Sequence, residues 1–328
     1  MAQSMQSSGG VVFQLPGDRI ITGKASHATR KITPYAPQTL IIGLPGGCYD
    51  AKYFDAHPTA SPLKLAEDLD IPFVALNRPS YSGSSPMPEY DASKQTWMQA
   101  QGPYIVETIV PAVLKTVSDA VPIKNVVLYG HGTGAAIVTI AAAAYSKTFK
   151  SGNPLPYTLA GVIVSSIASS AAVGGPAPPT IADGPTGFPI DVKDAVMING
   201  PGRDFAPEEV FALSPEIDQA APQAEFYDIA WQWSTYWEKY AQEVEVPVLH
   251  MLEESGPMWG PDGRAKQAEF VGALQKLKNG RGPAASTMLV AHAPHCLELS
   301  HAAQQVVLSA FGWAVATGRA KEFERSTS

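Results

Sequence analysis

Short apolar runs alternate along this chain with longer stretches that have the character of helices. A run that is apolar at every position indicates a strand buried on both faces of a parallel sheet. The runs predict β-strands at residues 11–15, 19–22, 39–43, 72–76, 126–128, 157–164, 246–252 and 287–291. The longer stretches predict helices at residues 101–119, with a kink at Pro111, and at 135–144, 265–278 and 298–317.

The order of these elements predicts the class of fold. The first two strands flank the turn sequence Pro16-Gly17-Asp18 and are expected to form a hairpin at the edge of the sheet. From residue 39 onwards strands alternate with helices, which is typical of a mostly parallel, doubly wound α/β sheet. The chain carries no internal repeat at the short periods of solenoid proteins.

The stretch from Asn125 to Val138 is the most informative part of the chain. It reads as a short buried strand, a very tight turn and a helix rich in small residues. Three glycines, Gly130, Gly132 and Gly134, remove side chains at the place where strand and helix must approach each other closely. A small-residue helix of this kind can lie flat on a sheet.

This layout resembles the nucleophile elbow of the α/β-hydrolase superfamily, which is often written Gly-x-Ser-x-Gly. The segment 130–134 reads Gly-His-Gly-Thr-Gly, so it has the flanking glycines and the common His131 but carries Gly132 in the place of the serine. Glycine has no nucleophilic atom, so an acyl-enzyme cannot form there. The resemblance extends over residues 11–317. It implies a mostly parallel eight-stranded sheet flanked by helices, with a helical cap after the sixth strand.

The cap is expected at residues 166–244, between core segments 1–165 and 245–328. This stretch contains Pro- and Gly-rich loops at 174–179 and 184–189, followed by a cluster of aromatic residues. Such side chains either line an apolar pocket or pack the cap onto the core, and we expect both in part. The cluster consists of Phe226, Tyr227, Trp231, Trp233, Tyr236, Trp237 and Tyr240.

Two further segments match the superfamily. Residues 45–49, Pro-Gly-Gly-Cys-Tyr, resemble the loop that supplies one N–H group to the oxyanion hole. The resemblance implies donors at Gly47 or Cys48 and at Thr133. Residues 77–84 resemble a segment that shapes a turn and carries no chemistry. The substrate pocket is assigned to Tyr49, Trp231, Trp259 and His131, the last as a packed or hydrogen-bonded histidine.

The remaining members of a catalytic triad are a histidine and an acid. His295, in a Pro-His-Cys-Leu-Glu sequence after the last strand, matches the histidine position, whereas His292 and His301 are expected to be structural or solvated. Aligning on Trp259 puts Gly256 at the position of the acid. We therefore assign the carboxylate to Glu254, with Glu253 as the alternative, to orient His295 by a different route.

Composition and charge exclude several classes of function. A net charge of −7 without a basic run argues against nucleic-acid binding. The two cysteines, Cys48 and Cys296, cannot build a disulfide framework, and neither a signal peptide nor a transmembrane run is evident, so we expect a cytoplasmic protein. The spacing of His, Asp and Glu indicates no metal site, and we expect no cofactor. The oligomeric state is left open.

Three functional hypotheses follow. The first is a non-hydrolytic enzyme that uses acid/base and oxyanion-hole chemistry to isomerise, condense or cyclise a hydrophobic carbonyl compound, as the likeness to hydrolase-like proteins of fungal secondary metabolism suggests. The second is a serine esterase or lactonase in which Gly132 has replaced the nucleophile. The third is a catalytically dead protein that binds a small molecule. A cysteine hydrolase is disfavoured, because Cys48 lies in the oxyanion loop instead of at the tip of the elbow.

Overall fold

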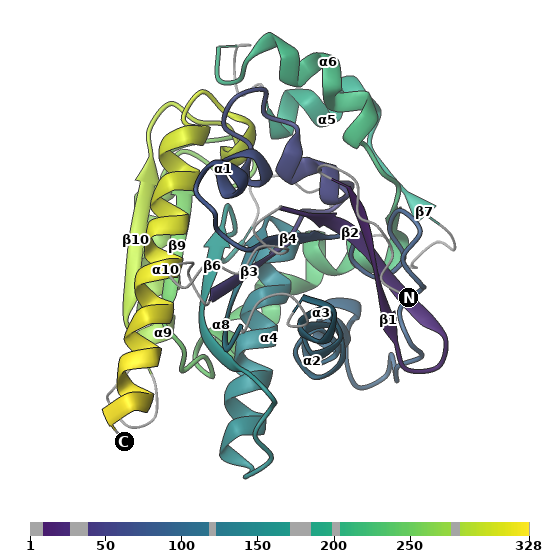
Figure 1. The fold of residues 1–328 in the computed structure, drawn as a ribbon. Helices are drawn as coiled ribbons and strands as arrows, with labels where there is room; N and C mark the ends of the chain where they lie inside the picture. Colours follow the sequence, from purple (N-terminus) through teal and green to yellow (C-terminus); the bar gives the residue numbers. More distant parts are fainter. Residues whose placement is uncertain are drawn as a thin grey trace.

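The fold is described by a computed structural model, which places residues 9–26, 39–117, 123–170, 185–198, 204–276 and 283–327. Its centre is an eight-stranded sheet with the order β1-β2-β4-β3-β5-β6-β9-β10 (Figure 1). The strands are β1 (Gly10–Leu15), β2 (Arg19–Ala25), β3 (Thr39–Leu44), β4 (Phe73–Leu76), β5 (Asn125–His131), β6 (Thr158–Ser165), β9 (Val248–Glu253) and β10 (Ala285–Val290).

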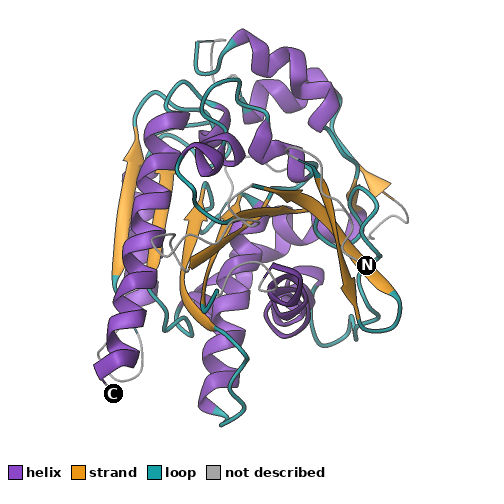
Figure 2. Cartoon of the chain, viewed as in Figure 1, coloured by secondary structure: helices purple, strands orange, loops and turns teal. Residues whose placement is uncertain are grey.

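Strands β3 to β6, β9 and β10 run parallel, whereas β1 pairs antiparallel with β2, and β2 with β4. The predicted hairpin at the sheet edge and the predicted parallel sheet are therefore both confirmed. Helices cover both faces of this sheet (Figure 2). The architecture is the α/β-hydrolase fold that the sequence predicts.

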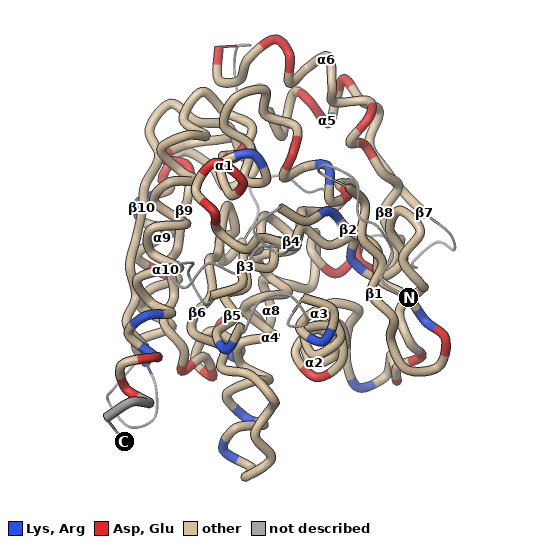
Figure 3. Tube along the Cα trace, in the orientation of Figure 1, with Lys and Arg blue, Asp and Glu red and all other residues tan. Residues whose placement is uncertain are grey.

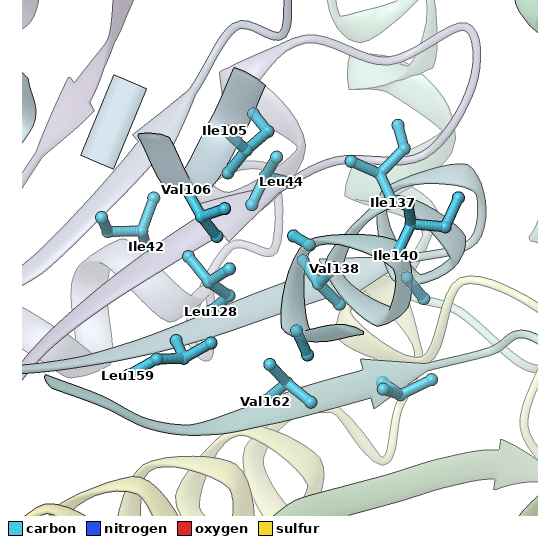
Figure 4. Packing of buried hydrophobic residues seen from close by; sticks show 14 of the residues in the cluster. Ile42, Leu44, Ile105, Val106, Leu128, Ile137, Val138, Ile140, Leu159 and Val162 are labelled. Atoms are coloured by element: carbon cyan, nitrogen blue, oxygen red, sulfur yellow. The ribbon is translucent and has the colours of Figure 1, made fainter. Parts of the chain in front are cut away.

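The central strands bury side chains on both faces, as their unbroken apolar runs predict. Leu40, Ile42 and Leu44 of β3 enter one hydrophobic cluster, and Ile41 between them enters the other. This alternation follows from the two-residue period of a strand. Figure 4 shows part of the first cluster, in which Leu128 of β5 packs among the side chains of neighbouring strands and helices.

The helices of the core occupy largely the predicted stretches. They are α1 (Pro62–Asp68), α2 (Trp97–Tyr104), α3 (Val110–Val117), α4 (Thr133–Lys150), α9 (Gly263–Gln275) and α10 (Ala303–Thr327), with 3₁₀ turns η2 (Ala51–Asp55) and η5 (Leu297–Leu299). The predicted helix 101–119 begins earlier, at Trp97, and contains a π-helical turn, η3 (Ile105–Ile109). The irregularity immediately precedes Pro111, because proline has no N–H to continue the α-helical ladder. The predicted end at residue 119 lies outside the described residues.

The segment between β6 and β9, which we call the insertion, holds shorter elements. These are β7 (Pro185–Thr186), α5 (Ile190–Met197), α6 (Glu208–Ile217), β8 (Ala221–Pro222), α7 (Gln223–Tyr227), the π-helical η4 (Asp228–Gln232) and α8 (Trp233–Ala241). Acidic side chains prevail along α5 and α6 (Figure 3). The loop predicted at 174–179 lies outside the described residues. None of the helices in the described ranges is both long and apolar enough to cross a membrane.

Candidate active site

The carboxyl ends of the parallel strands converge on one place. Gly46 and Gly47 follow β3, Gly132 follows β5, Glu253 ends β9 and His295 follows β10. In open α/β sheets the carboxyl ends of the strands form the crevice where ligands bind. The topology therefore brings the predicted elbow, the predicted loop and His295, which lie far apart in sequence, to this edge of the sheet together with Glu253.

The turn between β5 and α4 has the backbone of a nucleophile elbow. Gly132 has φ +52° and ψ −119°, a left-handed conformation that side chains adopt only under strain. Gly130 and Gly134 are required by packing, because a Cβ on Gly130 would lie 2.3 Å from the carbonyl oxygen of Gly134, and one on Gly134 would lie 2.1 Å from that of Leu44. The predicted role of these two glycines is confirmed.

The imidazole of His295 lies directly against the tip of the elbow. Its Nε2 is 3.3 Å from the point where a Cβ on Gly132 would stand, and its Nδ1 is 3.4 Å from Oε1 of Glu253. Both side chains are buried. One ring nitrogen faces a carboxylate and the other faces the reaction site, which is the arrangement in which a histidine acts as a general base.

The carboxylate beside His295 belongs to Glu253, so the expectation that Glu254 takes this position is wrong. Glu253 is the last residue of β9 and points into the site, whereas Glu254 is exposed and its backbone N–H binds the carbonyl of Val290. Gly256 explains why Glu253 fits. A Cβ on Gly256 would lie 3.3 Å from Cγ of Glu253, so the absence of a side chain at 256 leaves room for the longer acid.

The residues of the predicted oxyanion loop, 45–49, lie across from the elbow. Gly47 contacts Thr133 closely, because a Cβ on Gly47 would stand 3.0 Å from the Thr133 hydroxyl oxygen. Cys48 has a left-handed backbone, with φ +60°. Thr133 is the first residue of α4, where amide N–H groups have no partner within the helix and attract negative charge. The three predicted donor residues, Gly47, Cys48 and Thr133, therefore border one space.

That space is a cavity of about 350 Å³ with a largely apolar wall. All four residues assigned to the pocket, Tyr49, His131, Trp231 and Trp259, line it together with His295. The insertion supplies much of the wall. Its contributors are Phe188, Met197, Phe226, Ile229, Ala230 and Trp231. The aromatic residues of the insertion have both expected roles. Phe226 and Trp231 line the cavity, whereas Trp233 and Trp237 are buried in the core.

A second ionisable cluster lies beneath the elbow. The carboxylate of Glu298 is wholly buried and accepts hydrogen bonds from Tyr53 (2.6 Å), Tyr129 (2.7 Å) and Ser165 (2.5 Å). Nδ1 of His131 is 3.3 Å from Oε2 of the same carboxylate, and burial lowers the pKa of His131. His131 is thus a packed, buried histidine whose ring faces the Glu298 carboxylate.

We expect Glu298 to make the stability of the fold depend on pH. Burial acts to raise the pKa of its carboxyl, but His131 and the hydroxyl donors outweigh burial and lower the pKa from 4.5 to about 2. Because this pKa is lower in the folded state than in the unfolded state, the carboxylate stabilises the fold above pH 4.5. That stabilisation is lost as the pH falls towards 2. At about 1.4 kcal/mol per unit, this stabilisation is on the order of 3 to 4 kcal/mol.

Urea unfolding of the Glu298→Gln variant between pH 7 and pH 3 measures this contribution. The variant should be less stable than the wild type at pH 7, and the difference should shrink as the pH falls. Glu89→Gln, which alters an exposed carboxylate, is the matched control and should change little at any pH. A difference for Glu298→Gln that stays constant over the whole range would contradict the assignment.

Neither cysteine has the character of a nucleophile. Burial raises the pKa of the Cys48 thiol to about 11 and that of Cys296 to about 12. Cys296 Sγ lies 3.6 Å from both the Tyr49 hydroxyl and Nε2 of His131, inside the buried cluster. The competing histidines, His292 and His301, are exposed. In the described part of the chain, no group of three or more His, Cys, Asp or Glu residues is arranged to hold a metal ion.

Sequence reasoning missed two buried cations beside the oxyanion loop. Arg78 lies in the segment that was expected only to shape a turn, and Lys193 lies on α5 of the insertion. Both are fully buried and pair with carboxylates of the insertion, Glu225 and Asp218. The conspicuous signal in the sequence is Arg78, because an arginine directly after a buried strand needs a partner.

Comparison with known proteins identifies the family of the chain. A model of the alpha/beta hydrolase family matches residues 41–308. No curated protein sequence matches the chain.

Solved structures with the same fold include the following three proteins. DcsB in complex with its substrate analogue is 14% identical, with 96% of this chain and 100% of that chain covered and a TM-score of 0.59. E-2-(acetamidomethylene)succinate hydrolase is 14% identical, with 94% and 99% covered and a TM-score of 0.55. A thermophilic esterase from Thermogutta terrifontis, with malate bound, is 13% identical, with 94% and 99% covered and a TM-score of 0.54. Identities this low show a shared fold alone. Together with the family match, which spans most of the sequence, they place the chain in the alpha/beta hydrolase family.

Proposed function

We propose that this protein is a non-hydrolytic enzyme that moves protons on a hydrophobic carbonyl compound. One observation carries the proposal: the base occupies the place next to the missing nucleophile. Nε2 of His295 stands 3.3 Å from the absent Cβ of Gly132, a separation too close for an ordinary side chain at 132 without a shift of the ring. The groups that remain are a general base and N–H donors for an anion, which suit enolate chemistry.

The proposed reaction begins with proton transfer. His295 Nε2 accepts a proton from the carbon next to the substrate carbonyl, the C–H electron pair moves to form the enolate, and the N–H groups near Gly47 and Thr133 hold the enolate oxygen. The carboxylate of Glu253 stabilises the imidazolium that results. The imidazolium then returns the proton to another atom, which gives isomerisation. Alternatively the enolate carbon attacks a carbonyl carbon, the C=O electron pair moves to its oxygen, and that oxygen takes the proton from the imidazolium, which gives an aldol-type condensation or a cyclisation.

The wall of the cavity supports a hydrophobic substrate. Tryptophans 231 and 259 and methionines 197 and 258 border it, and such side chains present flat or adaptable apolar surfaces. We propose that the insertion serves as the cap of the site, because its residues line the cavity at the carboxyl ends of the strands. An apolar, capped site excludes water and strengthens the interaction between the donors and an enolate oxygen.

Binding of 4-nitrophenol tests this function. Its phenolate resembles an enolate, and its neutral and anionic forms absorb at different wavelengths and coexist near neutral pH. The wild-type protein should bind the phenolate preferentially and lower the pKa of the bound probe by about one unit or more, since each unit corresponds to about 1.4 kcal/mol of preference for the anion. Spectrophotometric titration between pH 5 and pH 9 measures the shift.

Variants assign the effect to the proposed groups. His295→Ala should reduce the shift, because the base that takes the phenol proton is gone, whereas His301→Ala changes an exposed histidine and should leave it intact. Equal affinity for phenol and phenolate in the wild type would contradict an anion site. A full shift that persists in His295→Ala would favour a binding protein over an enzyme.

A further inference from the structure

Arg78 ties the insertion to the oxyanion loop. Its Nε donates to the carbonyl of Pro45 at 2.9 Å, and its Nη2 donates to that of Gly46 at 3.0 Å. The same guanidinium forms a two-pronged ion pair with Glu225 of α7, which also accepts a hydrogen bond from the hydroxyl of Tyr81 at 2.6 Å. A planar guanidinium is suited to bridge two carbonyls and a carboxylate at once.

Lys193 holds the other end of the loop. Its Nζ donates to the carbonyl of Cys48 at 2.6 Å, pairs with Asp218 and lies 3.7 Å from the centre of the Tyr49 ring. The backbone N–H of Gln219 donates to the same Cys48 carbonyl at 3.0 Å. Lys193, Asp218 and Gln219 all belong to the insertion, so three carbonyls of the loop, at residues 45, 46 and 48, are bound by Arg78 or by the insertion.

The orientation of these carbonyls fixes the orientation of the N–H groups. A trans peptide carries its C=O and the following N–H on opposite sides of a rigid plane. With the carbonyl of Gly46 turned to Arg78, the N–H of Gly47 must point to the opposite side of the loop. Arg78 does not line the cavity, whereas Gly46 and Gly47 do. Arg78 therefore turns the Gly46 carbonyl away and directs the N–H of Gly47 to the side of the cavity, while Lys193 holds the Cys48 carbonyl and so fixes the other end of the same loop.

We propose that Arg78 and Lys193 are positioning residues that assemble the oxyanion hole, and that the hole is complete only when the insertion is seated on the core. Both cations are bound by carboxylates of the insertion, so withdrawal of the insertion breaks the contacts that orient the loop. Without them, the carbonyls are free to turn towards the cavity, where they repel an anion. This inference rests on the proposed function, because it assumes that the loop receives an enolate oxygen.

Burial of both cations supports a role beyond attachment. Each lies in the interior without exposure, where a charge is costly unless hydrogen bonds satisfy it fully. Apolar side chains attach one segment to another at lower cost. Holding carbonyl oxygens on one side needs hydrogen-bond donors, and both cations donate to carbonyls of the loop.

The contacts of Lys193 with the Cys48 carbonyl and Asp218, which we call the latch, can be tested by hydrogen exchange. Exchange is measured by mass spectrometry on the wild-type protein and on Lys193→Met. Methionine keeps an apolar stem of similar length but loses the donor. The reporter is the peptide that contains Gln219, because its N–H binds the Cys48 carbonyl. We expect this peptide and the peptide covering residues 45–50 to exchange at least about tenfold faster in Lys193→Met, in line with the loss of a local contact. Lys239→Met, on an exposed face of α8 in the same insertion, should exchange as the wild type does. Unchanged exchange in Lys193→Met would overturn the latch.

The bound 4-nitrophenol spectrum separates positioning from mere attachment. Lys193→Met and Arg78→Lys should both reduce the preference for phenolate, and Arg78→Lys is informative because lysine retains the charge opposite Glu225 but cannot bind two carbonyls as well. A faster exchange combined with an unchanged spectrum would show a structural contact only and overturn positioning. If the wild type shows no preference for phenolate, the proposed function fails, and so does the claim that the N–H groups of the loop receive an anion. The exchange experiment still decides whether the latch exists.

Discussion

The Gly132→Ser variant is expected to gain covalent reactivity that the wild type lacks. An alkyl fluorophosphonate should label the variant once, at residue 132, and should leave the wild-type protein unlabelled. The serine oxygen forms a bond to phosphorus, fluoride leaves, and the hydroxyl proton passes to His295. The expectation follows from the elbow backbone at Gly132, which places a side chain at the helix N-terminus, and from the adjacent base and donors.

The rate of labelling should be modest. A Cβ at residue 132 stands 3.3 Å from Nε2 of His295, so the ring must retreat by a few tenths of an ångström, and the residue must adopt a left-handed backbone. Intact-mass spectrometry measures the labelling over time. The double variant Gly132→Ser with His295→Ala should label at least about a hundredfold more slowly, since a general base contributes roughly 10² to 10⁴ in rate. Absence of labelling in Gly132→Ser would show that the acyl-transfer geometry is not retained.

The same experiment weighs the alternative functions. Rapid turnover of an aryl ester by Gly132→Ser, as opposed to a single slow labelling, would favour a serine esterase or lactonase whose nucleophile has been replaced. A His295→Ala variant that keeps full ligand binding and full biological activity would favour a binding protein.

Local patterns predicted the elements that depend on neighbouring residues. The buried runs gave the strands because a strand covered on both faces needs apolar side chains at every position. Gly130 and Gly134 indicate the elbow because a Cβ at either position would lie only 2.3 or 2.1 Å from a backbone carbonyl oxygen, so no other residue fits there. His295 lies after β10, and the loop after the last strand has a fixed place in this topology, so its position is predictable from the order of elements.

Long-range pairing was not predictable in the same way. Glu253 and Glu254 are adjacent and chemically equal, and the choice between them depends on the space left by Gly256. Arg78 meets Glu225 across nearly half of the chain, and Lys193 meets the Cys48 carbonyl. No periodicity encodes such pairs, because they result from how the insertion packs on the core. The sequence therefore predicts the strands and the elbow around the candidate site better than the contacts that hold them.

Proton exchange at carbon is expected to show the second large effect. Incubated in heavy water with a small, uncharged aryl alkyl ketone such as propiophenone, the wild-type protein should exchange the hydrogens next to the carbonyl for deuterium. His295 removes the proton, the enolate oxygen rests on the N–H donors, and the imidazolium returns a deuteron. His295→Ala should lower the enzyme-dependent rate by roughly 10² to 10⁴, and Glu253→Gln should lower it by a smaller factor than the loss of the base itself.

Two controls make the comparison specific to the site. Glu254→Gln alters the neighbouring exposed carboxylate and should exchange as the wild type does. Trp231→Ala removes part of the apolar wall of the cavity, while the base and the donors remain in place. It should therefore raise the ketone concentration needed for half-maximal rate. Equal effects of Glu253→Gln and Glu254→Gln would contradict the assignment of the acid to Glu253.

The most direct measurement is the deuterium content of the recovered ketone, determined by mass spectrometry for the wild type and for His295→Ala side by side. The account predicts deuterium at the carbon next to the carbonyl with the wild type, and incorporation close to the protein-free rate with His295→Ala. Wild-type incorporation no faster than in protein-free buffer, or incorporation that survives loss of the imidazole, would contradict a proton-transfer enzyme built on His295.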